Sequence, residues 1–177
     1  MSWLRNLLGG KTMAALSAGT KAPQFELPSM DASKFSLTEA LMRGPVLAVF
    51  FKVSCPVCQY AFPYFERVYK AYGNSKLTVI GISQNEKQDT AAFIKNFGVT
   101  FPVLLDDTKL FPVSNAYGLT TVPTAVWISE EGAIEISSVG WVRSEFEEIC
   151  QKAAFAAGDT PKPVFQPAEQ VADFRAG

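Results

Sequence analysis

A closely spaced pair of cysteines, Cys55-Pro56-Val57-Cys58, is the strongest chemical signal in the chain. It follows an apolar run over residues 46–51, typical of a strand buried on both faces, and precedes a helical stretch that ends near residue 72. Unpaired N–H groups and the dipole at a helix start stabilise a thiolate, the reactive form of cysteine. The spacing lets Cys58 reach the sulfur of Cys55. We therefore predict that Cys55 attacks a substrate disulfide and that Cys58 resolves the mixed disulfide.

A metal site and an inert structural disulfide are weaker interpretations of this pair. A zinc or iron–sulfur site would need further ligands, but only Cys150 remains and the chain has no histidine. Cys150 lies near Phe146 and Ile149 in a predicted helix, and a free cysteine often packs as a small hydrophobic residue. We predict that Cys150 belongs to the core and that the chemistry needs neither a metal nor a cofactor.

Composition limits the other classes of function. The 177 residues are 48% hydrophobic, which suits one ordinary domain with some extension. The 16 basic and 17 acidic residues leave a net charge of −1 without a long run of either sign, so we expect no nucleic-acid partner. The absence of histidine excludes Ser–His and Cys–His nucleophile pairs. Three cysteines, an odd number, argue against a secreted fold held together by disulfides.

The elements around the cysteine pair alternate between strands and helices. A short helix capped by Ser36 and Glu39 precedes the apolar strand. After the cysteine helix we expect a strand at 77–82, a helix at 89–97, a strand at 101–105, a helix at 109–117, a hairpin of strands 124–129 and 133–139, and a last helix, capped by Ser144 and Glu147, that ends near residue 157. This order predicts a mixed α/β fold.

The two ends of the chain are predicted to lie outside this domain. We divide the chain into an N-terminal extension at 1–18, a domain at 19–158 and a C-terminal tail at 159–177, which is rich in proline and has no obvious core face. Apolar residues at helical spacing within 1–11 suggest an interfacial helix that contacts a membrane, but we favour a frayed extension. No continuous apolar segment marks a secretory signal, so we expect a cytoplasmic protein. The alternative is the periplasmic side, with the N-terminus as an atypical signal or anchor.

Several motifs together resemble the thioredoxin superfamily. More narrowly, they are similar to the redoxin branch, which joins thiol–disulfide oxidoreductases of the cytochrome-maturation type with the alkyl-hydroperoxide-reductase/thiol-specific-antioxidant group. The motifs are the segment 50–58 around the cysteines, Phe62-Pro63, the segment Tyr117-Gly118-Leu119-Thr120-Thr121-Val122-Pro123-Thr124, the entry Ala22-Pro23-Gln24-Phe25 and the segment 101–106. The resemblance implies a thioredoxin-like fold with a central mixed β-sheet flanked by helices.

The resemblance also implies the roles of the site residues. It assigns Cys55 as nucleophile and Cys58 as resolving thiol, and it implies a cis Pro123 opposite them. In such a site the backbone of Val122 offers a strand-like edge to an extended substrate segment, so we expect substrate contacts at Val122, Pro123, Pro56 and Val57. The expected partners are a protein or small-molecule disulfide and a dithiol/disulfide redox partner.

The sequence departs from relatives of this kind at three positions near the cysteines. Ser54 stands where typical members have Trp, Val49 where thioredoxins have a buried Asp, and Ala61 where many cytochrome-maturation-type members have Glu. The usual groups that take a proton from the resolving thiol are therefore missing.

Two alternative functions remain open at the level of the sequence. A thiol peroxidase would have Pro and Thr where this chain has Ala48 and Lys52, so peroxide reduction is less favoured. A non-catalytic interaction domain would dock partners through the aromatic residues after the cysteines. We expect those residues to form helix core instead; they are Tyr60, Phe62, Tyr64, Phe65, Tyr69 and Tyr72.

Overall fold

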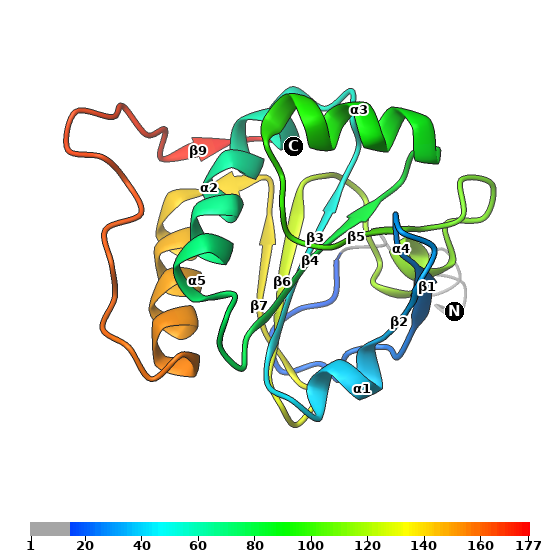
Figure 1. Ribbon diagram of the computed structural model, residues 1–177, viewed down its shortest axis with the longest axis horizontal. Coiled ribbons are helices and arrows are strands. Elements are labelled where there is room, and N and C mark those ends of the chain that lie inside the picture. The colour runs from blue at the N-terminus through cyan, green and yellow to red at the C-terminus, as the bar shows by residue number, and fades with distance from the viewer. Residues whose placement is uncertain (1–14) are drawn as a thin grey trace, which may run out of the picture.

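A five-stranded mixed sheet forms the centre of the computed structural model, which describes residues 15–177 (Figure 1). The predicted interfacial helix within residues 1–11 lies outside the described residues. The strand order is β5-β4-β3-β6-β7, with β3 parallel to β4 and antiparallel to β6. The elements are β1 Glu26–Pro28, β2 Lys34–Ser36, α1 Leu37–Leu41, β3 Val46–Phe51, α2 Pro56–Tyr72, β4 Thr78–Ser83, α3 Lys87–Phe97, β5 Val103–Leu105, α4 Pro112–Ala116, β6 Thr124–Ile128, β7 Ile134–Val139, β8 Trp141–Val142, α5 Arg143–Ala156 and β9 Phe174–Arg175.

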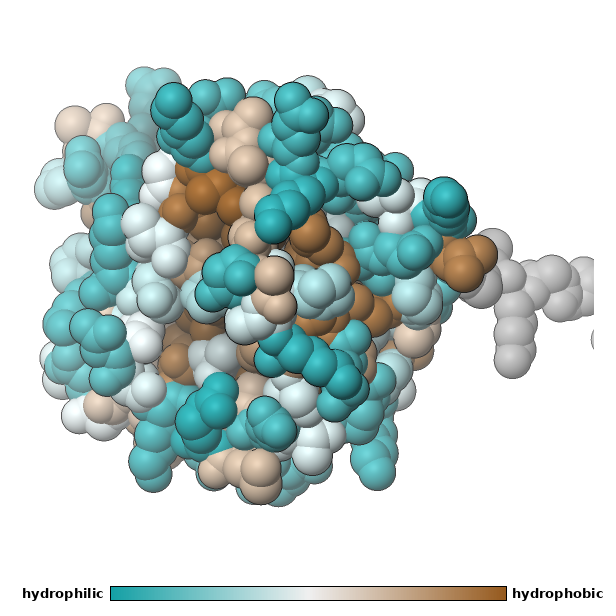
Figure 2. Space-filling model, turned by 45° about the vertical axis from the view of Figure 1, so that its right-hand side comes forward, coloured by the Kyte–Doolittle hydropathy of each residue, from teal (hydrophilic) through white to brown (hydrophobic). Residues whose placement is uncertain are grey.

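Strand β3 divides the core into two halves. All six of its residues are buried, and successive side chains point to opposite faces of the sheet. Leu47, Val49 and Phe51 pack with residues of α2, α3 and α5, whereas the alternate residues of β3 pack with α1, α4 and the β1–β2 hairpin. Figure 2 shows one face of the molecule, on which apolar residues lie in recesses between polar side chains. The predicted mixed sheet flanked by helices is confirmed.

The boundaries of several elements differ from the prediction. The helix expected at 109–117 is only α4, because Phe111 takes a left-handed backbone conformation and Pro112 begins the helix. The predicted cap of the last helix is wrong. Helix α5 follows directly on β8, so Val142 occupies the cap position and makes no side-chain capping bond, while Ser144 lies within the first turn. Among the described residues, no helix is long and apolar enough to cross a membrane.

The C-terminal tail does have a core face, which corrects the expectation from its composition. Residues 159–177, hereafter the C-terminal strap, run alongside α5 and α2 (Figure 1), and β9 pairs antiparallel with β8. Phe165 lies within 6.5 Å, centroid to centroid, of the rings of Tyr64, Trp141 and Phe146. The prolines keep residues 161–167 out of helices and strands, but apolar side chains of the strap still pack on the core.

Polar contacts hold the strap at several points. The Arg67 guanidinium donates to both carboxylate oxygens of Glu169, at 2.8 and 2.9 Å, and to the carbonyl of Val164 at 2.8 Å. The Trp141 indole N–H donates to the carbonyl of Ala172 at 2.6 Å. The bidentate pairing of Arg67 with Glu169 fixes the orientation of the two side chains as well as stabilising the contact. The strap is therefore a docked part of the fold.

Acid should weaken this docking. The hydrogen bonds from Arg67 lower the pKa of Glu169 from 4.5 to about 2. A carboxyl group whose pKa is depressed by folding stabilises the folded state above its unfolded pKa and loses that contribution as pH falls through the folded value. We expect the NMR resonance of the Trp141 indole N–H, which is bonded to the strap, to shift as pH falls from 4.5 to about 2.

The matched control is Glu169→Gln, which keeps the size of the side chain but cannot titrate. In that variant the same resonance should show no titration in this window. A native resonance that does not move would contradict the assigned role of the ion pair.

Candidate redox site

The end of β3 delivers Cys55 to the start of α2. Cys55 is the N-cap residue, with an extended backbone (φ −80°, ψ 115°), and Pro56 occupies the first helical turn. The backbone N–H of Cys58 donates to the Sγ atom of Cys55 at 3.2 Å. Cys55 is half-buried and Pro56 is exposed. The structure therefore places the sulfur of a half-buried cysteine at the helix N-terminus, as the sequence predicted.

Two side chains that the sequence analysis did not single out position the turn before Cys55. Asn85, from the loop after β4, accepts a hydrogen bond from the backbone N–H of Val53 at 3.0 Å. Gln59, from the first turns of α2, donates to the carbonyl of Val53 at 2.9 Å. Both residues are polar and close to predicted elements, but nothing in their spacing indicates a shared target.

Strand β6 brings the second half of the site to the cysteines. Phe50 pairs with Thr124, so the residues just before β6 lie beside the turn that follows β3. The Val122–Pro123 peptide bond is cis, which confirms the prediction. The thiol of Cys55 donates to the carbonyl of Val122 at 3.3 Å. Of the four positions expected to contact substrate, Pro56 is exposed, Val57 and Val122 are half-buried, and Pro123 is buried.

Cys58 lies in apolar surroundings. Its side chain is fully buried, as are those of Val49 and Ala61, the two positions where relatives carry carboxylates. Burial, followed by a hydrogen bond to Cys55, raises the pKa of Cys58 well above its ordinary range. A proton on this thiol is therefore hard to remove at neutral pH.

The buried carboxylate of α2 is engaged elsewhere. Glu66 accepts hydrogen bonds from the backbone N–H of Thr100, at 2.8 Å, and from its hydroxyl. It joins α2 to the loop after α3, so it is a structural residue and leaves Cys58 without a carboxylate partner in this helix.

A small polar cavity adjoins Val122 on the side of α4. Its volume is about 180 Å³, and Lys52 is the one charged residue in its lining. The other lining residues are Gln84, Phe111, Ser114, Asn115, Leu119, Thr120, Thr121 and Val122. No sequence pattern predicts this cavity, because its walls come from four separate segments.

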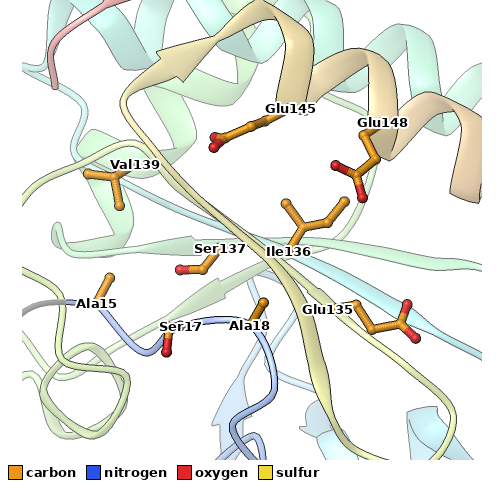
Figure 3. A pocket seen from close by; sticks show the side chains of 9 residues that line it. All are labelled: Ala15, Ser17, Ala18, Glu135, Ile136, Ser137, Val139, Glu145 and Glu148. Atoms are coloured by element: carbon orange, nitrogen blue, oxygen red, sulfur yellow. The ribbon is translucent and has the colours of Figure 1, made fainter.

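Cys150 and a cavity lined by three glutamates lie outside the site formed by Cys55 and Cys58. Cys150 is buried in the core as expected, and burial raises its pKa to about 12. A cavity of about 350 Å³ along β7 contains the carboxylates of Glu135, Glu145 and Glu148 but no cysteine (Figure 3). Neither place offers a second exposed thiol.

The comparisons with known proteins agree with this geometry. The AhpC/TSA family model matches residues 18–137. The thiol-disulfide oxidoreductase ResA of Halalkalibacterium halodurans is 29% identical over 76% of each chain, and ResA of Bacillus subtilis is 29% identical over 68% of this chain and 66% of its own.

Solved structures give the same picture. A thioredoxin-family thiol:disulfide interchange protein from Chlorobium tepidum is 26% identical with a TM-score of 0.65, covering 79% of this chain and 99% of its own. The thioredoxin domain of a thiol-disulfide oxidoreductase from Bacteroides vulgatus has a TM-score of 0.70 at 20% identity, covering 80% of this chain and 99% of its own. The fold is thus thioredoxin-like, and the site is that of an oxidoreductase of the thiol–disulfide class. The chain belongs to the AhpC/TSA family.

The three thiols should differ in accessibility. Iodoacetamide at neutral pH should label Cys55 first, because Cys55 is only half-buried and lies at the helix start, whereas Cys58 and Cys150 are buried and hold their protons. Mass spectrometry of the digested protein measures each site, and denatured protein should label at all three cysteines. Labelling of Cys150 as fast as Cys55 would contradict this assignment.

Proposed function

We propose that this protein exchanges disulfides with Cys55 as the nucleophile and Cys58 as the resolving thiol. The observation that carries the proposal is the position of the Cys55 sulfur. It caps α2, accepts the Cys58 N–H at 3.2 Å and contacts the Val122 carbonyl at 3.3 Å. A negative charge on this sulfur is stabilised by the N–H groups of the helix start.

The reaction proceeds in two exchanges. The Cys55 thiolate attacks one sulfur of the substrate disulfide, a mixed disulfide forms, and the other substrate sulfur leaves as a thiolate. Cys58 then loses its proton and attacks the Cys55 sulfur. The second substrate thiolate leaves, and a Cys55–Cys58 disulfide remains. Two electrons have passed to the substrate, so a dithiol partner must reduce the new disulfide before the next turnover.

The alternative functions have less support. The aromatic residues of α2 pack into the core, with Phe62 fully buried and Tyr72 nearly so, which leaves little of them for docking partners. Lys52 stands where a peroxidase would have a hydroxyl; it is exposed, its Nζ lies 6.0 Å from the centroid of the Phe111 ring, and an ammonium group cannot accept a hydrogen bond as a hydroxyl oxygen can. Consumption of hydrogen peroxide by the reduced protein would favour a peroxidase instead.

Cytoplasmic location is part of the proposal, because residues 1–11 lack a continuous apolar segment. The alternative is the periplasmic side, with those residues as an atypical signal or anchor. Cell fractionation of the full chain distinguishes the two compartments.

Substitution of single cysteines separates their roles. Cys58→Ser should accumulate a mixed disulfide with substrate, because attack still occurs but resolution does not. Cys55→Ser should form none and lose disulfide exchange altogether. Mass spectrometry under non-reducing conditions measures the adduct, and Cys150→Ala, the matched control, should exchange within about twofold of the native protein. An adduct on Cys55→Ser but not on Cys58→Ser would reverse the assignment.

Resolution should be slower than attack near neutral pH and should accelerate as pH rises. The raised pKa of Cys58 leaves little thiolate at neutral pH, and the fraction grows with pH. Stopped-flow measurement of both steps across pH tests this order. Ala61→Glu should supply a local base and accelerate resolution by about a hundredfold, since general base catalysis commonly contributes that much.

Ala61→Gln is the matched control, because it has the same bulk but no basic group and should leave resolution slow. Fast, pH-independent resolution in the native protein would show that another base serves Cys58.

A further inference from the structure

The end of the C-terminal strap lies on the substrate edge of the site. Gly177 is so close to Val122 that a methyl group added at Gly177 would collide with the Val122 carbonyl oxygen and with Oγ1 of Thr121. The same carbonyl accepts the thiol hydrogen of Cys55. The backbone expected to bind an extended substrate therefore already has a neighbour from this chain.

The strap is held there by contacts on both sides. Strand β9 pairs with β8 through Trp141↔Arg175 and Val142↔Phe174. The Arg175 guanidinium lies 3.9 Å from the ring centroid of Tyr60 in α2, close enough for a cation–π interaction.

The turn between β7 and β8 completes this contact. A Cβ added at Gly140 would collide with the carbonyl of Arg175, so the turn and the strap touch through their backbones. The N–H of Gly140 also donates to the carbonyl of Pro123 at 2.8 Å, and Pro123 itself is buried. The strap and the cis-proline loop therefore share one packed region, and a second extended chain would meet the end of the strap on that side of Val122.

The opposite approach to Val122 remains open. The cavity of about 180 Å³ beside Val122 has no strap residue in its lining, and Lys52 gives it a positive charge. Val122, whose carbonyl contacts the Cys55 thiol, lines this cavity, so the cavity offers one arm of a small disulfide a place beside the site. Cys55 is only half-buried and its neighbour Pro56 is exposed, so this side of the site is not fully covered.

We propose that Phe174–Gly177 restrict this enzyme to small disulfides by occupying the edge that an extended protein substrate would need. This inference rests on the proposed function, since it concerns access to the same Cys55 sulfur. A protein substrate can bind only in the fraction of molecules whose strap has left the edge, so its apparent affinity falls by that fraction.

The test compares a small and a protein substrate before and after truncation. Fully reduced protein is mixed with 3,3′-dithiodipropionate or with insulin, and its oxidation is followed by stopped flow. The native chain should react readily with the small disulfide and slowly with insulin. Truncation after Asp173, which removes Phe174–Gly177, should raise the insulin rate about tenfold or more and change the small-disulfide rate by no more than about twofold.

A shorter truncation keeps the test valid if the longer one disturbs folding. Truncation after Arg175 keeps β9 and removes only Ala176 and Gly177, which are exposed, and it should also raise the insulin rate selectively. Phe155→Ser is the control, because it removes another exposed apolar side chain, 88% accessible, from α5; it should change neither rate.

The outcomes separate this inference from the proposed function. An insulin rate that both truncations leave unchanged, while the small disulfide still reacts, would overturn the inference and leave the proposed function intact. Equal loss of both rates in the folded Arg175 truncation would also overturn it, because the strap would then support the reaction. A reduced native protein that reacts with neither disulfide would overturn both.

Discussion

The burial of β3 on both faces is the constraint on which the redox site depends. A strand covered by two cores cannot slip by one residue, because every side chain would then point to the wrong half. The fixed register pairs Phe50 with Thr124 and so places the turn after β3 beside the loop before β6. The contact between Cys55 and Val122 is therefore a consequence of the sheet register.

Helix α2 connects this register to the strap. Its first turn holds both cysteines, while Tyr60, two residues after Cys58, accepts a hydrogen bond from the N–H of Ala172 at 3.0 Å and lies beneath Arg175. Arg67, two turns further on, binds Glu169. Aromatic packing of the same helix supplies the surface on which the strap docks. A change that reorients α2 would thus alter the reactive sulfur and the cover of the substrate edge together.

The parts of the site that depend on local sequence patterns could be predicted from the sequence. A continuous apolar run, a proline at a helix start and a three-residue cysteine spacing define β3, the N-terminus of α2 and the thiol pair, and the motif around Pro123 indicated the cis bond. The strap could not be predicted in this way. Its contacts, such as Arg67 with Glu169, join residues about a hundred positions apart, and its proline-rich composition alone resembles a disordered tail. The cavity beside Lys52 was missed for the same reason.

The strap and Cys58 both affect the mixed disulfide at Cys55. Cys58 determines how long it lasts, and the strap determines which other thiols can reach it. Because Val49 and Ala61 surround Cys58 with apolar groups, its pKa is raised and little of it is thiolate at neutral pH, so we expect the mixed disulfide at Cys55 to persist. A persistent mixed disulfide can be attacked by any thiol that reaches the Cys55 sulfur, which would expel the substrate as a thiol and leave the attacking molecule bound to Cys55 in a new mixed disulfide. A cover over the Val122 edge limits such attack to small thiols. A missing base near Cys58 is therefore less harmful in a site that the chain's own strap closes to protein thiols, and the slow resolving thiol and the strap are physically compatible in one molecule.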